Sequence, residues 1–123
     1  DVLNRIRGPF NLSGVALAGA EAAIGDRDWV AECLRVNAKE RARLVGGLRQ
    51  LGIACDDSHA NFVLARFADE GAALAADTHL KGQGIIVRHP KNYGFANALR
   101  ITVGQVADND RVLAALAAFR GAV

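Results

Sequence analysis

Two arginines in apolar, β-branched surroundings are the residues of this sequence best suited to chemistry. Arg88 ends the run Ile85-Ile86-Val87, and Arg100 lies inside Leu99-Arg100-Ile101-Thr102-Val103. A guanidinium in such a strand is costly to bury unless an anion pairs with it. Its planar fork suits carboxylate or phosphate, which it binds through two hydrogen bonds. We therefore expect Arg88 and Arg100 to converge on one small anion; the alternative is that each faces solvent or pairs with an Asp on the sheet surface.

The other reactive residue types give weaker signals. Asp57, Ser58 and His59 are triad residue types, but they are adjacent, whereas a triad is assembled in space. Turn formation explains them better. No His or Cys pair has metal-ligand spacing, so no zinc site is expected. Gly82-Gln83-Gly84 precedes a strand instead of following one, which favours a helix end over a phosphate-binding loop.

Short strands and capped helices are expected to position the two arginines. Ser13 and Asp26 are typical N-caps of the first two helices. The pattern predicts helices over residues 14–24, 27–51, 71–81 and from about 108 onward, and strands over 53–55, 61–67, 85–88 and 99–103. In the strand 61–67, alternation places Phe62, Leu64 and Arg66 on one face. The fold class is therefore α+β: a small mixed or antiparallel sheet of three to four short strands with helices packed on one face.

The first predicted helix is apolar on every side. Between Gly14 and Ile24 only Glu21 is charged. A helix of this kind is normally buried on most sides, and a chain of 123 residues has few other elements to surround it. We expect it to pack against a part of the protein outside this chain; the alternative is a central helix of a small domain. Two domains are predicted. Residues 1–25 form a connector, extended up to about Phe10, and the inter-domain helix, and residues 26–123 form a small domain.

The second and last predicted helices carry apolar stripes. The stripe of the long helix, where Cys33 would act as a small hydrophobe, comprises Val30, Cys33, Leu34, Leu44, Val45, Leu48 and Leu51. The last helix turns inward Val112, Leu113, Leu116 and Phe119. A charge run mostly off the first stripe is predicted to be a solvated face, formed by Lys39, Glu40, Arg41 and Arg43.

Composition excludes several classes of protein. Hydrophobic residues make up 51% and charged residues 23%, which predicts a packed core instead of disorder. A net charge of +2 is too small to indicate nucleic acid, and no apolar run is long enough to span a membrane. No signal peptide is visible, and two cysteines outside any C-x-x-C pair favour a reduced, cytoplasmic setting. The absence of Met fits a fragment cut from a longer chain.

Four stretches of this sequence resemble the C-terminal part of histidinol-phosphate aminotransferases. The most specific is Tyr93-Gly94-Phe95-Ala96-Asn97-Ala98-Leu99-Arg100-Ile101-Thr102-Val103-Gly104, preceded by Gly84-Ile85-Ile86-Val87-Arg88. Asn61-Phe62-Val63-Leu64 resembles the strand before them, and Arg7-Gly8-Pro9-Phe10-Asn11 resembles the segment that joins that family's two domains. The sequence departs from the family at Phe95-Ala96, where Leu-Pro is common.

The resemblance implies a homodimeric fold-type-I aminotransferase that uses pyridoxal phosphate. Such an enzyme transfers an amino group between histidinol phosphate and 2-oxoglutarate, in histidine biosynthesis. It also implies that Arg100 anchors the anionic end of a small amine substrate and that Arg88 assists. Lys39, Lys81 and Lys91 lie in no stretch like the family's Schiff-base motif. Cofactor and catalytic residues are therefore expected in a missing N-terminal large domain, and this chain alone is expected to be inactive.

Other functions remain open at this point. A second member of the same superfamily, such as an aromatic-amino-acid aminotransferase or a threonine-phosphate decarboxylase, would share the two arginines. A stand-alone α+β module could bind a small anion for regulation without any cofactor, although the apolar first helix argues against it. An RNA-binding sheet is disfavoured, since one Trp and one Tyr are too few for base stacking.

Overall fold

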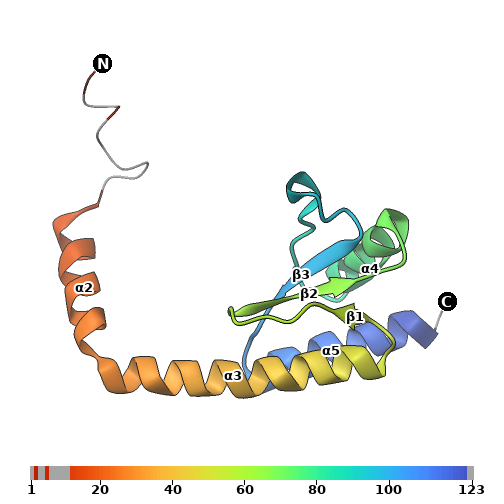
Figure 1. Cartoon of the computed structure of the whole chain (residues 1–123), viewed down its shortest axis with the longest axis horizontal. Helices are drawn as coiled ribbons and strands as arrows, with labels where there is room; N and C mark the ends of the chain where they lie inside the picture. The colour runs from red at the N-terminus through yellow and green to blue at the C-terminus, as the bar shows by residue number, and fades with distance from the viewer. Residues whose placement is uncertain (1, 3–4, 6–11, 122–123) are drawn as a thin grey trace. The chain divides into compact units, whose positions relative to one another are not determined.

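The computed structural model describes Val2, Arg5 and residues 12–121, and shows four α-helices and three strands in these ranges (Figure 1). The elements in chain order are α2 (Gly14–Gly25), α3 (Arg27–Gln50), β1 (Ala54–Cys55), β2 (Phe62–Arg66), α4 (Glu70–Gly82), the 3-10 helix η1 (Lys91–Tyr93), β3 (Ala98–Thr102) and α5 (Val106–Gly121). The chain divides into two compact units, one up to Leu34 and one from Arg35 onward. The domain boundary expected after residue 25 stays a prediction, and the extended connector expected over residues 1–10 lies outside the described residues except at Val2 and Arg5.

The three strands form one antiparallel sheet in the order β1-β2-β3. In its register Leu64 faces Arg100 and Phe62 faces Thr102. The fourth predicted strand, 85–88, is wrong as a strand, since only Arg88 pairs with β3. Its start is tied to α4 because the Ile85 N–H donates to the Leu80 carbonyl at 2.9 Å. Its end meets Pro90, which has no N–H for pairing.

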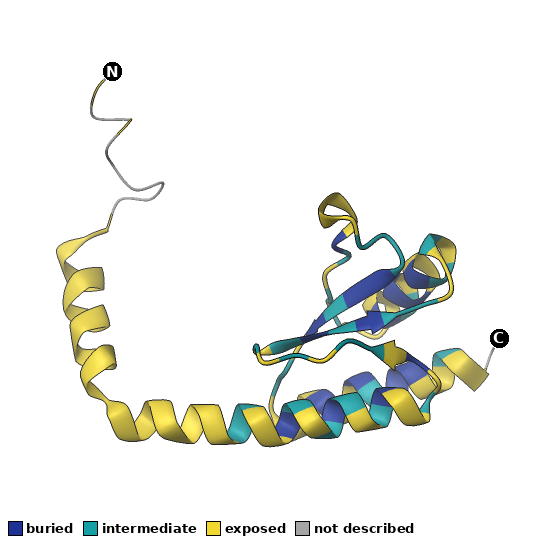
Figure 2. Cartoon of the chain, in the orientation of Figure 1, coloured by how far each residue is buried: buried dark blue, intermediate teal, exposed yellow. Residues whose placement is uncertain are grey.

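One face of the sheet is covered by helices, as the alternation predicts. Val63, Ala65, Leu99 and Ile101 are buried there, while Phe62, Leu64 and Arg66 are half-buried on the opposite, open face. Figure 2 shows the buried residues on β2, β3 and the inner sides of the helices, and the core cluster includes Leu44, Leu48, Ala76, Leu80, Val112, Ala115 and Leu116. The α+β fold with a small antiparallel sheet is confirmed. The covered face fixes the sheet, so that the open face can present side chains to a ligand.

The helix caps follow the sequence closely. The Ser13 side chain accepts a hydrogen bond from the Ala16 N–H at 3.2 Å, and Asp26 accepts one from the Trp29 N–H at 3.0 Å. Asp69 caps α4 by accepting from the Ala72 N–H at 2.8 Å. These short polar side chains satisfy main-chain donors that a helix start leaves without partners. The helices therefore begin within two residues of where the sequence predicts them.

The apolar stripe of α3 is buried only in its second half. Leu44 and Leu48 are fully buried, but Val30, Cys33 and Leu34 are exposed, contrary to the expectation for the first half. The first half of α3 therefore contributes no residue to the core cluster.

The charge run on α3 is also not the uniformly solvated face that the sequence predicts. Glu40 is buried, at 2% exposure, and Arg43 is half-buried. Glu40 lies four and eight residues before Leu44 and Leu48, so helical geometry places it on the buried side of α3.

Every residue of α2 is exposed. Val15 and Ile24 are 85% and 79% exposed, so α2 has no core of its own within its unit. That α2 packs against another part of the protein stays a prediction. No helix in the described part of the chain combines the length and the apolar character needed to cross a membrane.

Candidate anion-binding site

The structure brings Arg88 and Arg100 together as a main-chain pair. The Arg88 N–H donates to the Arg100 carbonyl at 3.1 Å, and the Arg100 N–H donates to the Arg88 carbonyl at 2.8 Å. Two residues that exchange both hydrogen bonds in an antiparallel pair lie directly opposite each other, and their side chains leave on the same face. Because Leu64 also faces Arg100, this is the open face of the sheet. The structure therefore shows the main-chain pairing of the two arginines, and that their guanidiniums share one anion stays a prediction.

Neither arginine has an acidic partner among the described residues, which sets the pair apart from other arginines of the chain. Arg66 forms a bidentate ion pair with Asp56, with distances of 2.6–3.0 Å, and Arg49 pairs with Asp57 at 3.2 Å. The Arg100 Nε is buried and has no hydrogen-bond partner. A buried donor without a partner costs free energy, and an incoming anion would relieve that cost.

Aromatic rings support both guanidiniums. The Arg100 guanidinium carbon lies 5.1 Å from the centre of the Phe62 ring, and that of Arg88 lies 5.3 Å from the Tyr93 ring. Arg88 also donates from Nη2 to the Tyr93 hydroxyl at 3.2 Å. These contacts are attractive but leave the positive charge uncompensated. The open face therefore presents two oriented cations whose charge is available to a ligand.

The loop between η1 and β3 holds Tyr93 in place. A His89 ring nitrogen donates to the Ala96 carbonyl at 2.6 Å, which closes the loop across its base. Asn97 ties the loop end to β2, because the Phe67 N–H donates to the Asn97 carbonyl at 2.8 Å. Pro90, which precedes η1, is buried. The departure at Phe95-Ala96 thus lies in a loop that is fixed at both ends.

A buried polar network fixes the other end of β3, and sequence reasoning missed it. The Asn109 amide donates to a Glu40 carboxylate oxygen at 3.0 Å and to the Gly104 carbonyl at 3.0 Å, and its oxygen accepts from the Gly104 N–H at 3.0 Å. Arg43 donates to the same Glu40 oxygen at 2.7 Å and also pairs with Asp110. Hydrogen bonds from Arg43 and Asn109 lower the pKa of Glu40. The four-residue spacing from Glu40 to Leu44 was the available signal.

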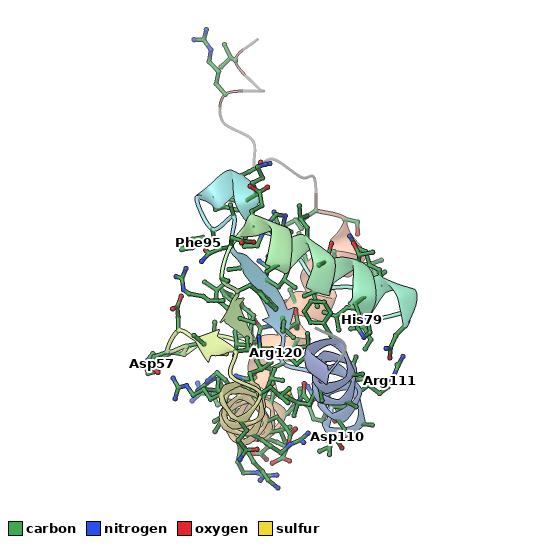
Figure 3. The ribbon with its side chains drawn as sticks, turned by 90° about the vertical axis from the view of Figure 1, so that its right-hand side faces the viewer. Asp57, His79, Phe95, Asp110, Arg111 and Arg120 are labelled. Carbon is green, nitrogen blue, oxygen red and sulfur yellow. The ribbon has the colours of Figure 1, made fainter. Side chains whose placement is uncertain are left out.

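The remaining sequence candidates have structural roles. Ser58 donates to the Phe62 carbonyl at 2.6 Å and accepts from the Ala60 N–H at 3.2 Å, so it organises a turn. Asp57 pairs with Arg49, and His59 is exposed. His79 packs against Phe119, with 5.6 Å between ring centres, on the opposite side of this unit from Asp57 (Figure 3). Among the described residues no group of His, Cys, Asp and Glu side chains is arranged to hold a metal ion.

The three lysines lie in ion pairs or on a helix surface. Lys81 pairs with Asp77 at 2.6 Å, and Lys91 pairs with Glu70 at 2.7 Å. Lys39 is exposed on α3. A lysine that forms a Schiff base needs a free amine beside the reacting group. None of the three is in such a place.

Comparison with known proteins gives concordant results. The family model described as aminotransferase class I and II matches residues 1–116. The chain is 78% identical to the histidinol-phosphate aminotransferase of Jannaschia sp. strain CCS1 over 118 residues, which are 96% of this chain and 33% of that protein. It is 71% identical to the enzyme of Roseobacter denitrificans over 121 residues, 98% of this chain and 34% of that protein. The chain thus spans about a third of the length of these relatives.

Solved structures show the same similarity. The crystal structure of histidinol-phosphate aminotransferase from Sinorhizobium meliloti in complex with pyridoxal-5'-phosphate matches with a TM-score of 0.87 and 28% identity, over 98% of this chain and 34% of that one. The histidinol-phosphate aminotransferase from Clostridium acetobutylicum matches with a TM-score of 0.81, over 98% of this chain and 37% of that one. At 23% identity the second comparison shows the fold alone.

Proposed function

The chain belongs to the aminotransferase class I and II family, and we propose that it is the substrate-binding C-terminal part of a histidinol-phosphate aminotransferase. The whole enzyme would transfer an amino group between histidinol phosphate and 2-oxoglutarate. The observation that carries the proposal is the pair formed by Arg88 and Arg100, on one sheet face and without acidic partners. High identity to histidinol-phosphate aminotransferases supports this substrate over others of the superfamily.

The arginine pair suits both substrates of this reaction. Histidinol phosphate carries a phosphate, and 2-oxoglutarate carries carboxylates, so one site must accept two kinds of oxyanion in turn. A guanidinium binds either group through two parallel hydrogen bonds. With the anion fixed by Arg100 and Arg88, the reacting end of the substrate is held at a defined distance, which turns a bimolecular encounter into an effectively unimolecular step.

Pyridoxal phosphate does not fit the residues of this chain. The three lysines lie in ion pairs or on the exposed side of α3. We therefore assign cofactor binding and the Schiff-base lysine to the large domain of the longer protein. This chain would supply substrate binding, and closing it over the large domain would exclude water from the site.

Three further properties belong to the same proposal. The exposed, apolar α2 would pack against the large domain, since such a helix is stable only when covered. The whole enzyme would be a homodimer in the cytoplasm, without nucleic-acid or membrane partners. This chain alone would not catalyse amino transfer.

The test is the substrate preference of the full-length protein. Purified enzyme loaded with pyridoxal phosphate should transfer the amino group of histidinol phosphate to 2-oxoglutarate with a much higher kcat/KM than that of phenylalanine. A preference for phenylalanine would identify an aromatic-amino-acid aminotransferase instead. Release of CO2 from threonine phosphate would identify a decarboxylase. Anion binding without turnover of any of these substrates would favour a regulatory anion-binding module.

A further inference from the structure

We propose that Phe62 is a positioning residue for Arg100: its ring holds the guanidinium in the orientation that receives the substrate anion. The inference rests on the proposed function and adds a specificity element to the same site. Phe62 would not touch the reacting atoms. It would act only through the side chain that binds the anion.

The strand pairing explains why Phe62 and Arg100 meet. Phe62 and Leu64 lie on the open face of β2, and Leu64 is directly opposite Arg100. Phe62 is therefore the diagonal neighbour of Arg100, a distance that an aromatic ring and a long side chain can bridge. The guanidinium carbon lies 5.1 Å from the ring centre. The main chain that carries the ring is held as well, because the Ser58 hydroxyl donates to the Phe62 carbonyl at 2.6 Å.

The ring is the only directional contact that the Arg100 side chain makes in the described chain. No carboxylate of the described residues is paired with Arg100, and its buried Nε has no hydrogen-bond partner there. An arginine side chain has many rotamers, so a site that must bind an anion quickly benefits from fixing one of them beforehand. A carboxylate would fix the rotamer but neutralise the charge. An aromatic ring fixes it and leaves the charge for the ligand.

A second stacked pair on the same sheet serves as an internal control. The Arg66 guanidinium lies 5.4 Å from the centre of the Phe95 ring. Arg66 is already held by the bidentate pair with Asp56, at 2.6–3.0 Å. Loss of the Phe95 ring should therefore leave Arg66 in place. The same substitution at Phe62 and at Phe95 compares a ring that positions a ligand-binding arginine with one that does not.

The experiment uses the full-length enzyme with its cofactor and the variants Phe62→Leu, Phe62→Tyr and Phe95→Leu. We expect Phe62→Leu to raise KM for histidinol phosphate roughly 2- to 30-fold, the range that corresponds to cation–π attraction, with kcat changed less. Phe62→Tyr keeps the ring and should restore KM. Phe95→Leu should leave KM and kcat as in the parent enzyme.

The decisive readout is histidinol, the same amine without the phosphate. If Phe62 acts through the anion held by Arg100, Phe62→Leu should leave the slow reaction with histidinol unchanged while it weakens the reaction with histidinol phosphate. Equal losses with both amines would mean a general structural defect and would overturn the inference. Should Phe62→Leu lower the melting temperature, Phe62→Met provides the same comparison with a more adaptable side chain.

The proposed function has a separate outcome in the same assay. If Arg100→Ala weakens the enzyme but Phe62→Leu does not, the positioning role is wrong and the anion site stands. If Arg100→Ala has no effect either, the anion site itself is wrong. Inhibition by inorganic phosphate, measured for each variant, tests the same contact with an anion that does not itself react.

Discussion

The Asn109 amide donates to the Glu40 carboxylate at 3.0 Å, joining α5 to α3 across 69 residues of sequence. Through its other two hydrogen bonds Asn109 also holds Gly104, the second residue after β3. Glu40 is 2% exposed, and Arg43 donates to it from the neighbouring turn of α3. A buried carboxylate is tolerated when all its partners are in place. This network therefore fixes the exit of the strand that carries Arg100.

The network predicts a loss of stability in acid. The pKa of Glu40 is lowered in the folded state, chiefly by the hydrogen bond from Arg43 and then by that from Asn109. The carboxylate therefore stabilises the fold above its unfolded pKa of about 4.3, and this contribution is lost as the pH falls through the lower, folded value. Glu40→Gln should lower the free energy of opening of α3 and α5 at pH 7 and weaken its further fall in acid, as measured by hydrogen exchange corrected for the intrinsic pH dependence of the exchange. An unchanged acid response of that variant would contradict the assignment.

Removing the Arg100 guanidinium should weaken substrate binding strongly. Arg100→Ala in the full-length enzyme should lose roughly 2–5 kcal/mol of substrate binding, the scale for breaking a desolvated charge pair. This corresponds to about a 30- to 4,000-fold decrease in kcat/KM with histidinol phosphate. Steady-state kinetics measure it, and Arg66→Ala on the same sheet face is the matched control, since Arg66 pairs with Asp56. Kinetics of Arg100→Ala equal to those of the parent would rule out the role.

Two adjacent glycines in α3 should respond differently to alanine. A Cβ at Gly46 would meet no atom within 4 Å, whereas one at Gly47 would lie 2.7 Å from both terminal methyl carbons of Leu113 on α5. Alanine in a helix interior is favoured over glycine by about 1 kcal/mol. Gly46→Ala should therefore raise the denaturation midpoint. Gly47→Ala should be roughly 1–3 kcal/mol less stable than Gly46→Ala, because Leu113 must move.

The same pair of variants contains its own check. Leu113→Ala removes the close contact. In that background the stability change caused by Gly47→Ala should approach the change caused by Gly46→Ala. Equal midpoints for Gly46→Ala and Gly47→Ala would show that Leu113 rotates away at no cost.

Cys55 should be a poor nucleophile in the folded protein. Burial raises the pKa of its thiol from 9.0 to about 11, an effect larger than the opposing field of Arg49. At pH 8 the thiolate fraction is then about 100-fold lower than for an ordinary thiol. Alkylation by iodoacetamide, followed by mass spectrometry, should be correspondingly slow in native protein and fast in urea. Rapid native modification of Cys55 would show that this edge of the sheet opens.

Local signals in the sequence were sufficient for most of the fold. The N-cap residues Ser13 and Asp26, together with glycines at helix ends, predicted where the helices begin and end. These signals suffice because a helix end depends on a few neighbouring residues. The alternation of Phe62 and Leu64 against Val63 and Ala65 predicted which face of β2 is buried. The convergence of Arg88 and Arg100 on one anion stays a prediction, and the structure shows that their main chains pair.

The failures arose where the outcome depends on distant residues. The β-branched run 85–88 has strand propensity, but the bond from Ile85 to Leu80 and the missing N–H of Pro90 restrict its pairing to Arg88. Glu40 looked like part of a solvated face because its partner Asn109 is far along the chain. The contacts of the Phe62 and Tyr93 rings with the two arginines were not predicted. They depend on strand register and loop closure, which no pattern along the sequence specifies.

The sheet holds the main chains of the two arginines unequally. Arg100 lies within β3, where Leu99 and Ile101 pair with β2 on one side and Arg88 pairs with Arg100 on the other. Arg88 is joined to the sheet by that single pair. A bulkier or smaller head group would therefore shift Arg88 before it shifted Arg100. Arg88, in the segment before the loop, would then adapt to substrates with head groups of different size. Arg100, within β3, would discriminate between them.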